Sequence, residues 1–278
     1  MPLRYMKDFL VIILFLLIDL GCVSYAGWQF RSPQSVRSEG RAVAELILQD
    51  DDIYRVYSPS YSIPQLAAAD AGLQLADGVD PLQLKQYAEF MSTASGVPQT
   101  GYSVTIPPFT SGNPRLDNQD YSPDSYLLGL LNVKYIVAEY ELVSDSLKLV
   151  DRIENTRIYR NQEYRPRAWT QQGLSLFSAG IQPVDIVWQN ANRIELTAAG
   201  PGTLVLSEIE FPGWKVKVDG QWGEILTIGN LLRGVNLPPG IHTVSFIYRP
   251  TLMYVGMFLS GLLLVVFFAS LLMRKKQV

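Results

Sequence analysis

The chain has 278 residues, of which 48% are hydrophobic and 18% are charged, and its net charge is −3. A single cysteine, Cys22, excludes an intrachain disulfide, and a single histidine, His242, excludes a metal site built on two histidines. The sequence also lacks the motifs of dinucleotide binding, phosphate binding and serine-nucleophile catalysis. We therefore expect no catalytic residue, cofactor or metal site in this chain.

The first predicted element is an apolar run over residues 9–28, interrupted only by Asp19. A bilayer core of about 30 Å needs about 20 helical residues, so this run predicts a transmembrane helix. Arg4 and Lys7 precede it, and basic residues flank the cytoplasmic end of a membrane span. The sequence thus places the N-terminus in the cytoplasm.

Two alternatives remain open for this run. Ser24-Tyr25-Ala26 resembles the cleavage site of a signal peptide, and Cys22 permits a weaker lipoprotein interpretation. A carboxylate in a membrane helix is costly. Asp19 is therefore interpreted as a contact with another membrane helix, or as a side chain that is protonated or reaches the outer surface.

The segment between the two membrane runs, residues 29–251, carries 18 basic and 24 acidic residues and a net charge of −6. This balance argues against nucleic acid as a partner. Residues 29–167 predict a mixed α/β subdomain. The predicted helices are 36–49, one started by Asp80-Pro81 and one started by Ser122-Pro123; the predicted strands are 53–57, 134–138, 147–153 and 156–159; residues 95–121 predict a long loop. Asp50-Asp51-Asp52 lacks the spacing of a calcium loop and is interpreted as a solvated turn.

Residues 168–250 change to short strands that recur about every ten residues, which predicts an antiparallel β-sandwich. The predicted strands are 185–188, 193–197, 203–209, 214–218, 225–228, 234–237 and 242–248, with turns at Pro201-Gly202, Asp219-Gly220 and Pro238-Pro239-Gly240. His242 is interpreted as a packed or surface residue of the last strand.

The last predicted element is a transmembrane helix over residues 252–273, which contain no charge and are followed by three basic residues. This flank places the C-terminus in the cytoplasm and residues 29–251 outside it. Gly256 and Ser260 form a small-residue face suited to close helix packing. The fold class expected is thus an α+β membrane-anchored protein, with an α/β subdomain and a β-sandwich between two transmembrane helices.

Five segments stand out by their residue patterns. They are GVDPLQLKQY (78–87), LGLLNVKYIV (128–137), RPRAW (165–169), PGWKVKVDG (212–220), and PPGIHTV with YRP (238–244 and 248–250). In this order they resemble segments of the YfhO-type bacterial membrane proteins. That family is similar to GT-C glycosyltransferases, which take sugars from polyprenyl-phosphate carriers outside the cytoplasm.

The resemblance places this chain at the family's C-terminal part, without the early loop that is expected to hold the catalytic acid. It implies an extracytoplasmic accessory domain that positions a glycan or a lipid-linked acceptor and is not catalytic alone. Trp188, Trp214 and Trp222 are the candidate glycan contacts, because aromatic rings stack on sugars, although they could instead fill the core.

The alternative function is a structural subunit of a membrane complex with no glycan role. Asp19, Gly256 and Ser260 would then contact a polytopic partner. An enzyme acting alone is a third possibility, but no acid/base pair stands out among the acids of the outer segment.

Overall fold

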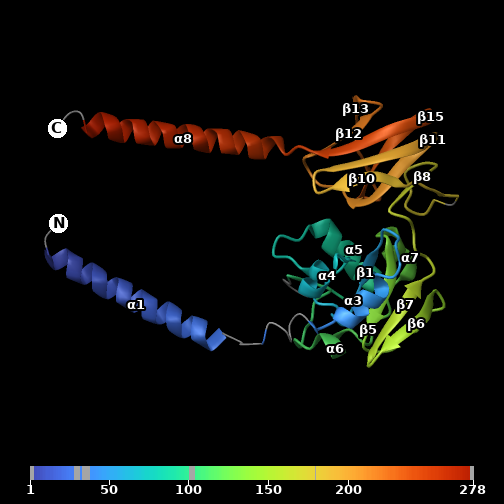
Figure 1. Cartoon of the computed structure of the whole chain (residues 1–278), viewed down its shortest axis with the longest axis horizontal. Helices are drawn as coiled ribbons and strands as arrows, with labels where there is room; N and C mark the ends of the chain where they lie inside the picture. Colours follow the sequence, from blue (N-terminus) through green and yellow to red (C-terminus); the bar gives the residue numbers. More distant parts are fainter. Residues whose placement is uncertain (1–2, 28–31, 33–37, 100–103, 179, 276–278) are drawn as a thin grey trace. The chain divides into compact units, whose positions relative to one another are not determined.

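The computed structural model describes residues 3–27, 32, 38–99, 104–178 and 180–275, and the chain divides into two units, Met1–Glu39 and Gly40–Val278. The first unit contains helix α1, Leu3–Gly27 (Figure 1). Its described apolar side chains are exposed, with Phe15 at 73% and Leu17 at 61%.

The first half of the second unit builds a five-stranded mixed sheet in the order β2-β1-β5-β7-β6. β1 pairs in parallel with β2 and β5, whereas β5–β7 and β7–β6 are antiparallel. The strands of this half are β1 (Arg55–Tyr57), β2 (Gln74–Leu75), β3 (Gly78–Val79), β4 (Thr105–Ile106), β5 (Val133–Ala138), β6 (Leu147–Ile153) and β7 (Thr156–Asn161). Its helices are α3 (Arg41–Ile47), α4 (Gln65–Ala71), α5 (Lys85–Ser95), α6 (Pro114–Asp117) and α7 (Ser125–Leu130).

Two helices of this half begin later than the sequence predicts. α5 begins at Lys85, because Asp80 accepts a hydrogen bond from the Leu82 amide, 2.8 Å away, in a separate turn. α7 is capped by Asp124, whose side chain accepts the Leu127 amide at 2.9 Å. The start of the predicted helix 36–49 lies outside the described residues.

The run of three aspartates is only partly a solvated turn. Asp50 and Asp52 both pair with the ammonium of Lys134, whose side chain is only 4% exposed. Burial by itself would lower the pKa of Lys134, but the hydrogen bonds and charges of the two aspartates outweigh it and raise the pKa. The run thus neutralises a buried cation of β5.

The second half forms one eight-stranded sheet with the path β13-β12-β15-β11-β8-β9, to which β10 and β14 add by pairing with β11 and β15. Its strands are β8 (Ala168–Gln171), β9 (Gln182–Pro183), β10 (Ile186–Asn190), β11 (Arg193–Ile209), β12 (Trp214–Val218), β13 (Gln221–Gly223), β14 (Leu226–Ile228) and β15 (Leu232–Tyr248). Antiparallel strands are confirmed here, but two separate sheets are not, because the strands are hydrogen-bonded into a single sheet.

β11 and β15 are each 17 residues long and replace two predicted strands apiece. The turns predicted at Pro201-Gly202 and Pro238-Pro239-Gly240 are wrong, because these segments face each other and form an irregularity in the ladder. Pairing resumes on both sides, with Gly200 opposite Gly240 and Gly202 opposite Leu237. Proline lacks a backbone N–H donor and cannot complete a regular ladder. Because the prolines of β11 and β15 lie opposite each other, the irregularity stays local and the pairing continues on either side of it.

Three hydrophobic clusters hold the second unit together. The first combines residues of the α/β half, such as Met91 and Leu128, with residues of the second half, such as Trp169 and Val205. The second lies within the large sheet and the third packs α3 and α4 against β1 and β5. Residue 167 therefore does not separate two independent cores.

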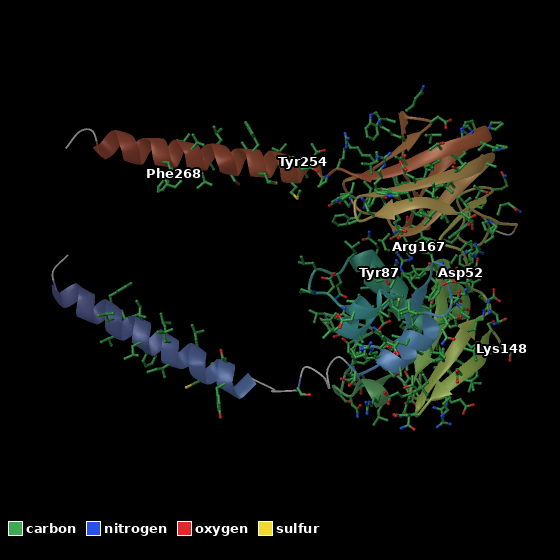
Figure 2. All side chains as sticks on the ribbon, in the orientation of Figure 1. Asp52, Tyr87, Lys148, Arg167, Tyr254 and Phe268 are labelled. Atoms are coloured by element: carbon green, nitrogen blue, oxygen red, sulfur yellow. The ribbon has the colours of Figure 1, made fainter. Side chains whose placement is uncertain are left out.

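Helix α8 spans Thr251–Lys275 (Figure 1). Among the described residues, Thr251–Phe268 is the one stretch long and apolar enough to cross a membrane, with a mean hydropathy of 2.2, while the apolar part of α1, Phe9–Tyr25, is shorter. Tyr254 and Phe268 on α8 are 54% and 58% exposed (Figure 2). A bare apolar surface of this kind supports membrane association.

Candidate functional site

Two exposed tryptophans end a row of side chains across the solvent face of the large sheet. Trp188 of β10 pairs with Glu195 of β11, Glu195 with Ser245 of β15, Ser245 with Lys217 of β12, and Lys217 with Trp222 of β13. Directly paired residues of antiparallel strands share a face, and four strand spacings of about 4.8 Å span about 19 Å. The Ser245 hydroxyl lies 3.4 Å from Glu195 Oε1, which fits this alignment.

The neighbouring residues of the same strands are buried on the opposite face, as alternation in a strand requires. They include Ile194, Leu196, Val216, Val244 and Phe246. The two ends of the row therefore lie on the outer surface, with Trp188 44% exposed and Trp222 52% exposed, whereas Ser245 at its centre is buried, with 9% exposure.

Trp222 lies within a group of cations, which we call the Trp222 cluster: Trp222, Lys215, Lys217 and Arg249. The ring centroid is 4.5 Å from Lys217 Nζ, 5.9 Å from Lys215 Nζ and 5.6 Å from Arg249 Cζ. None of the three cations forms a salt bridge with another described residue. Cation–π contact lets like charges gather around one ring.

Trp214 lies on the inner face of the sheet. It packs against the second hydrophobic cluster, and its ring is 3.9 Å from the Arg233 guanidinium and 5.4 Å from the Tyr248 ring. This packing supports the core-filling interpretation of Trp214, and only Trp188 and Trp222 present an open surface.

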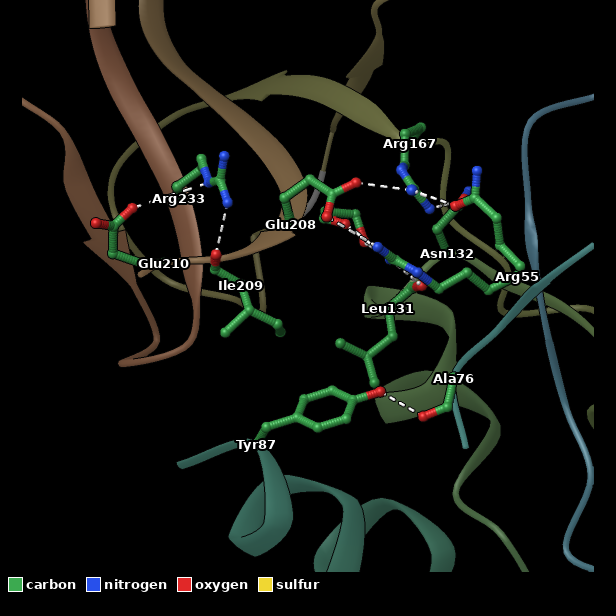
Figure 3. A network of polar contacts seen from close by, with 12 residues as sticks. Arg55, Ala76, Tyr87, Leu131, Asn132, Arg167, Glu208, Ile209, Glu210 and Arg233 are labelled. Atoms are coloured by element: carbon green, nitrogen blue, oxygen red, sulfur yellow. Dashed lines mark hydrogen bonds and ion pairs between the residues drawn. The ribbon is translucent and has the colours of Figure 1, made fainter. Parts of the chain in front are cut away.

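A buried polar network joins the two halves of the second unit (Figure 3). Glu208 of β11 receives Arg55 Nη2 at 3.0 Å on one oxygen and Arg167 Nη2 at 2.7 Å on the other. Arg55 also donates to the carbonyls of Leu131, at 3.0 Å, and Ser207, at 2.8 Å. One carboxylate thus bridges β1 of the first half to β11 of the second.

Burial and charge act against each other in this network. Burial favours a neutral Glu208, but Arg55, Arg167 and Arg233 outweigh it and hold the pKa of Glu208 below its usual range. Burial lowers the pKa of both Arg167 and Arg233 to about 10. Arg233 donates to the Ile209 carbonyl at 2.7 Å and lies 3.9 Å from Glu210.

The segments that carry the family resemblance supply much of this framework. Asn132, with a φ of 62°, donates its amide to the Arg165 carbonyl at 2.9 Å and accepts from Arg167 at 3.2 Å. Arg165 Nη2 donates to the Tyr126 hydroxyl at 2.6 Å. The arginines of RPRAW were noted in the sequence only as a pattern. Their role escaped prediction because Glu208 lies about 40 residues away in the chain.

A second feature that the sequence did not indicate is a pocket of about 350 Å³ lined largely by residues 75–84 with Tyr87. Asp77 lies in its wall, is only 8% exposed, and accepts a hydrogen bond from the Ser58 amide at 3.0 Å. Burial raises the pKa of Asp77 to about 7. The Tyr87 hydroxyl donates to the Ala76 carbonyl beside it.

The three predicted membrane-helix contacts are exposed on their helices. Asp19 lies on α1, and Gly256 and Ser260 lie on α8, where a Cβ added at Gly256 would meet no atom within 4 Å. Within the described part of the chain, no group of three His, Cys, Asp or Glu side chains could hold a metal ion.

Comparison with known proteins gives one family. No curated protein and no solved structure matches the chain significantly. Residues 181–260, from the end of the β8–β9 region through the large sheet into α8, match the family model of the bacterial membrane protein YfhO. The match confirms the family resemblance over these residues, which include β9 to β15 with the tryptophan row and the first part of α8.

Proposed function

We propose that the chain is a membrane-anchored, extracytoplasmic accessory domain of a glycosyltransferase system, and that it positions a glycan or a lipid-linked acceptor without being catalytic alone. The proposal includes α1 as a second span, cytoplasmic termini, and residues 29–251 outside. It also includes the two ends of the large sheet packed as the layers of a sandwich. The YfhO match and the apolar surface of α8 support it.

The observation that carries the glycan role is the row from Trp188 to Trp222. An exposed indole at each end supplies apolar stacking surface. Glu195 and Lys217 between them supply a carboxylate and an ammonium, which can hydrogen-bond to sugar hydroxyls, while Ser245 between these two is buried. Both aromatic and polar groups lie on rigid strands, so binding would cost little ordering of the protein.

Isothermal titration of the full chain in detergent, with cell-envelope oligosaccharides and polyprenyl-phosphate-linked sugars, tests this role. We expect binding that Trp188→Ala weakens by about tenfold, since the loss of about 55 Å² of apolar contact at about 25 cal/mol per Å² is worth about 1.4 kcal/mol. Trp214→Phe, on the inner face, serves as the control and should leave the affinity unchanged. Absence of binding to every glycan tested, or equal loss in both variants, would refute the glycan role.

A second candidate is a structural subunit of a membrane complex. It is favoured by the open small-residue face at Gly256 and Ser260, where a helix could approach closely. Sedimentation of the complex extracted in mild detergent tests it: Gly256→Leu should release a partner, whereas Val265→Leu should not. A monodisperse lone monomer in native extracts would argue against it.

A further inference from the structure

The Trp222 cluster lies where the chain enters helix α8. Arg249 precedes the first residue of α8, Thr251, by two positions, and adjacent Cα atoms are 3.8 Å apart. The Arg249 amide donates to the Gly213 carbonyl at 2.6 Å, which fixes this entry to the start of β12. The cluster is therefore held beside the first turn of α8 by the fold of the sheet and by chain connectivity.

The composition of the cluster matches the boundary between lipid and water. Indole rings concentrate at this boundary because one part of the ring is apolar and its N–H is polar. Lys and Arg next to a membrane helix attract anionic headgroups, at about 1 kcal/mol per charge. Lys215, Lys217 and Arg249 lie on a single exposed patch around Trp222 and form no salt bridge with other described residues.

The surroundings of the patch leave it open to such a partner. β13 is an edge strand of the sheet, so no further strand covers Trp222 on its outer side. Glu224 follows β13 in the chain and is exposed, but no salt bridge joins it to the three cations. Asp219, which follows β12, is already paired with His242 Nδ1 at 2.7 Å.

We propose that the Trp222 cluster is a membrane-contact site, in which Lys215, Lys217 and Arg249 bind the phosphates of anionic phospholipids around α8 and Trp222 inserts among their headgroups. The contact fixes the large sheet against the membrane surface. It goes beyond the proposed glycan role, because it needs only that α8 crosses the bilayer, whichever leaflet the cluster faces. It gives Trp222 and Lys217 to the lipid, so the glycan role then rests on Trp188, about 19 Å away along the row.

The test uses the full chain in nanodiscs that contain a phosphatidylcholine with a spin label on its headgroup, which quenches nearby indoles. The fluorescence lost on replacing Trp222 with Phe isolates the signal of Trp222, and Trp188→Phe isolates that of Trp188. We expect quenching of Trp222 to increase when about one third of the lipid is replaced by phosphatidylglycerol. Quenching of Trp188 should stay low in both lipids.

Charge is tested by the triple variant Lys215→Gln, Lys217→Gln, Arg249→Gln. Because each charge is worth about fivefold in association with an anionic surface, we expect the triple variant to lose nearly all of the increase. The control is a triple variant with the same change in net charge: Lys85→Gln, Lys148→Gln and Arg160→Gln. This control should keep the increase in Trp222 quenching.

Salt provides a measurement that does not need the triple variant, in case that variant fails to fold. At about 1 M salt the Debye length falls to about 3 Å, so the increase should vanish. Equal quenching of Trp222 in zwitterionic and anionic nanodiscs, an increase that survives high salt, or an equal loss in the control variant would overturn the proposal. None of these outcomes bears on glycan binding at Trp188.

Discussion

Glu208 is the single anion between two buried cations, and Glu208→Gln removes its charge without changing its shape. In the wild-type chain its oxygens receive Arg55 at 3.0 Å and Arg167 at 2.7 Å, and these three side chains are no more than 19% exposed. The neutral amide can still accept one hydrogen bond, but it leaves two guanidinium groups close together without a counter-charge. Breaking a buried ion pair by removing one partner costs about 3–5 kcal/mol. We expect a loss of about 3 kcal/mol in the free energy of unfolding.

Urea titration of the full chain in micelles measures this loss, with the fluorescence of the buried Trp169 as the signal. The matched control is Glu45→Gln, which removes the same charge from an exposed pair with Arg41 at 2.7 Å. An exposed pair at this helical spacing is worth about 0.3–0.5 kcal/mol. A loss at Glu208 no larger than the loss at Glu45 would show that the network does not hold the two halves together, and the reasoning would be wrong.

Three further changes are expected to act in separate ways. Burial raises the pKa of Asp77 to about 7, so the free energy of unfolding should fall as pH rises from about 4 to about 7. Asp77→Asn should remove this fall and, above pH 7, add on the order of 2 kcal/mol to the free energy of unfolding, seen as a higher urea midpoint at pH 8. The hydrogen bond that His242 Nδ1 donates to Asp219 raises the pKa of His242, so the stability from this pair is complete below the unfolded pKa and is lost as pH rises through the folded pKa. Asp219→Asn should abolish this loss in the same titration, and persistence of the loss would contradict the reasoning. A Cβ at Gly200 would lie 1.9 Å from a backbone carbonyl oxygen of β15, so Gly200→Ala should lower the thermal midpoint and cost about 1–3 kcal/mol of stability. Gly223→Ala is the control: its Cβ would meet no atom closer than 3.5 Å, so it should cost much less stability.

Local patterns predict most of the strands, because alternation is set by which face of a strand is buried. The residues of β12 illustrate this: Val216 is fully buried, while Lys215 is exposed. The hairpin β6–β7 also forms at its predicted residues. Glycine and proline predict local structure less reliably, because the same residues occur in turns and in irregular strands. Pro201 and Gly202 match a turn by composition, but their conformation is decided by the break in the strand opposite, about 37 residues away.

The candidate site, too, could be predicted only in part from local sequence patterns. Exposure of Trp188 and Trp222 follows from their sheet position, and their alignment in one row depends on the register of five strands, which no local pattern contains. The sequence offered Trp214 as a third candidate, although its alternation with Lys215 already favoured a position in the core. Its packing against the second hydrophobic cluster and under Arg233 then places it on the inner face.

The polar network gives a structural role to residues of two segments that resemble the family in sequence but lie outside the matched residues 181–260. Asn132, Arg165 and Arg167 come from resembling segments, yet none of them reaches the outer face of the sheet. They connect the α/β half to β11, whose other end carries Glu195 of the row. A change at Glu208 that loosens this connection should therefore weaken glycan binding at Trp188 only when it also lowers stability. Loss of binding without loss of stability would contradict this reasoning, because the buried Glu208 carboxylate does not lie on the outer face with the row.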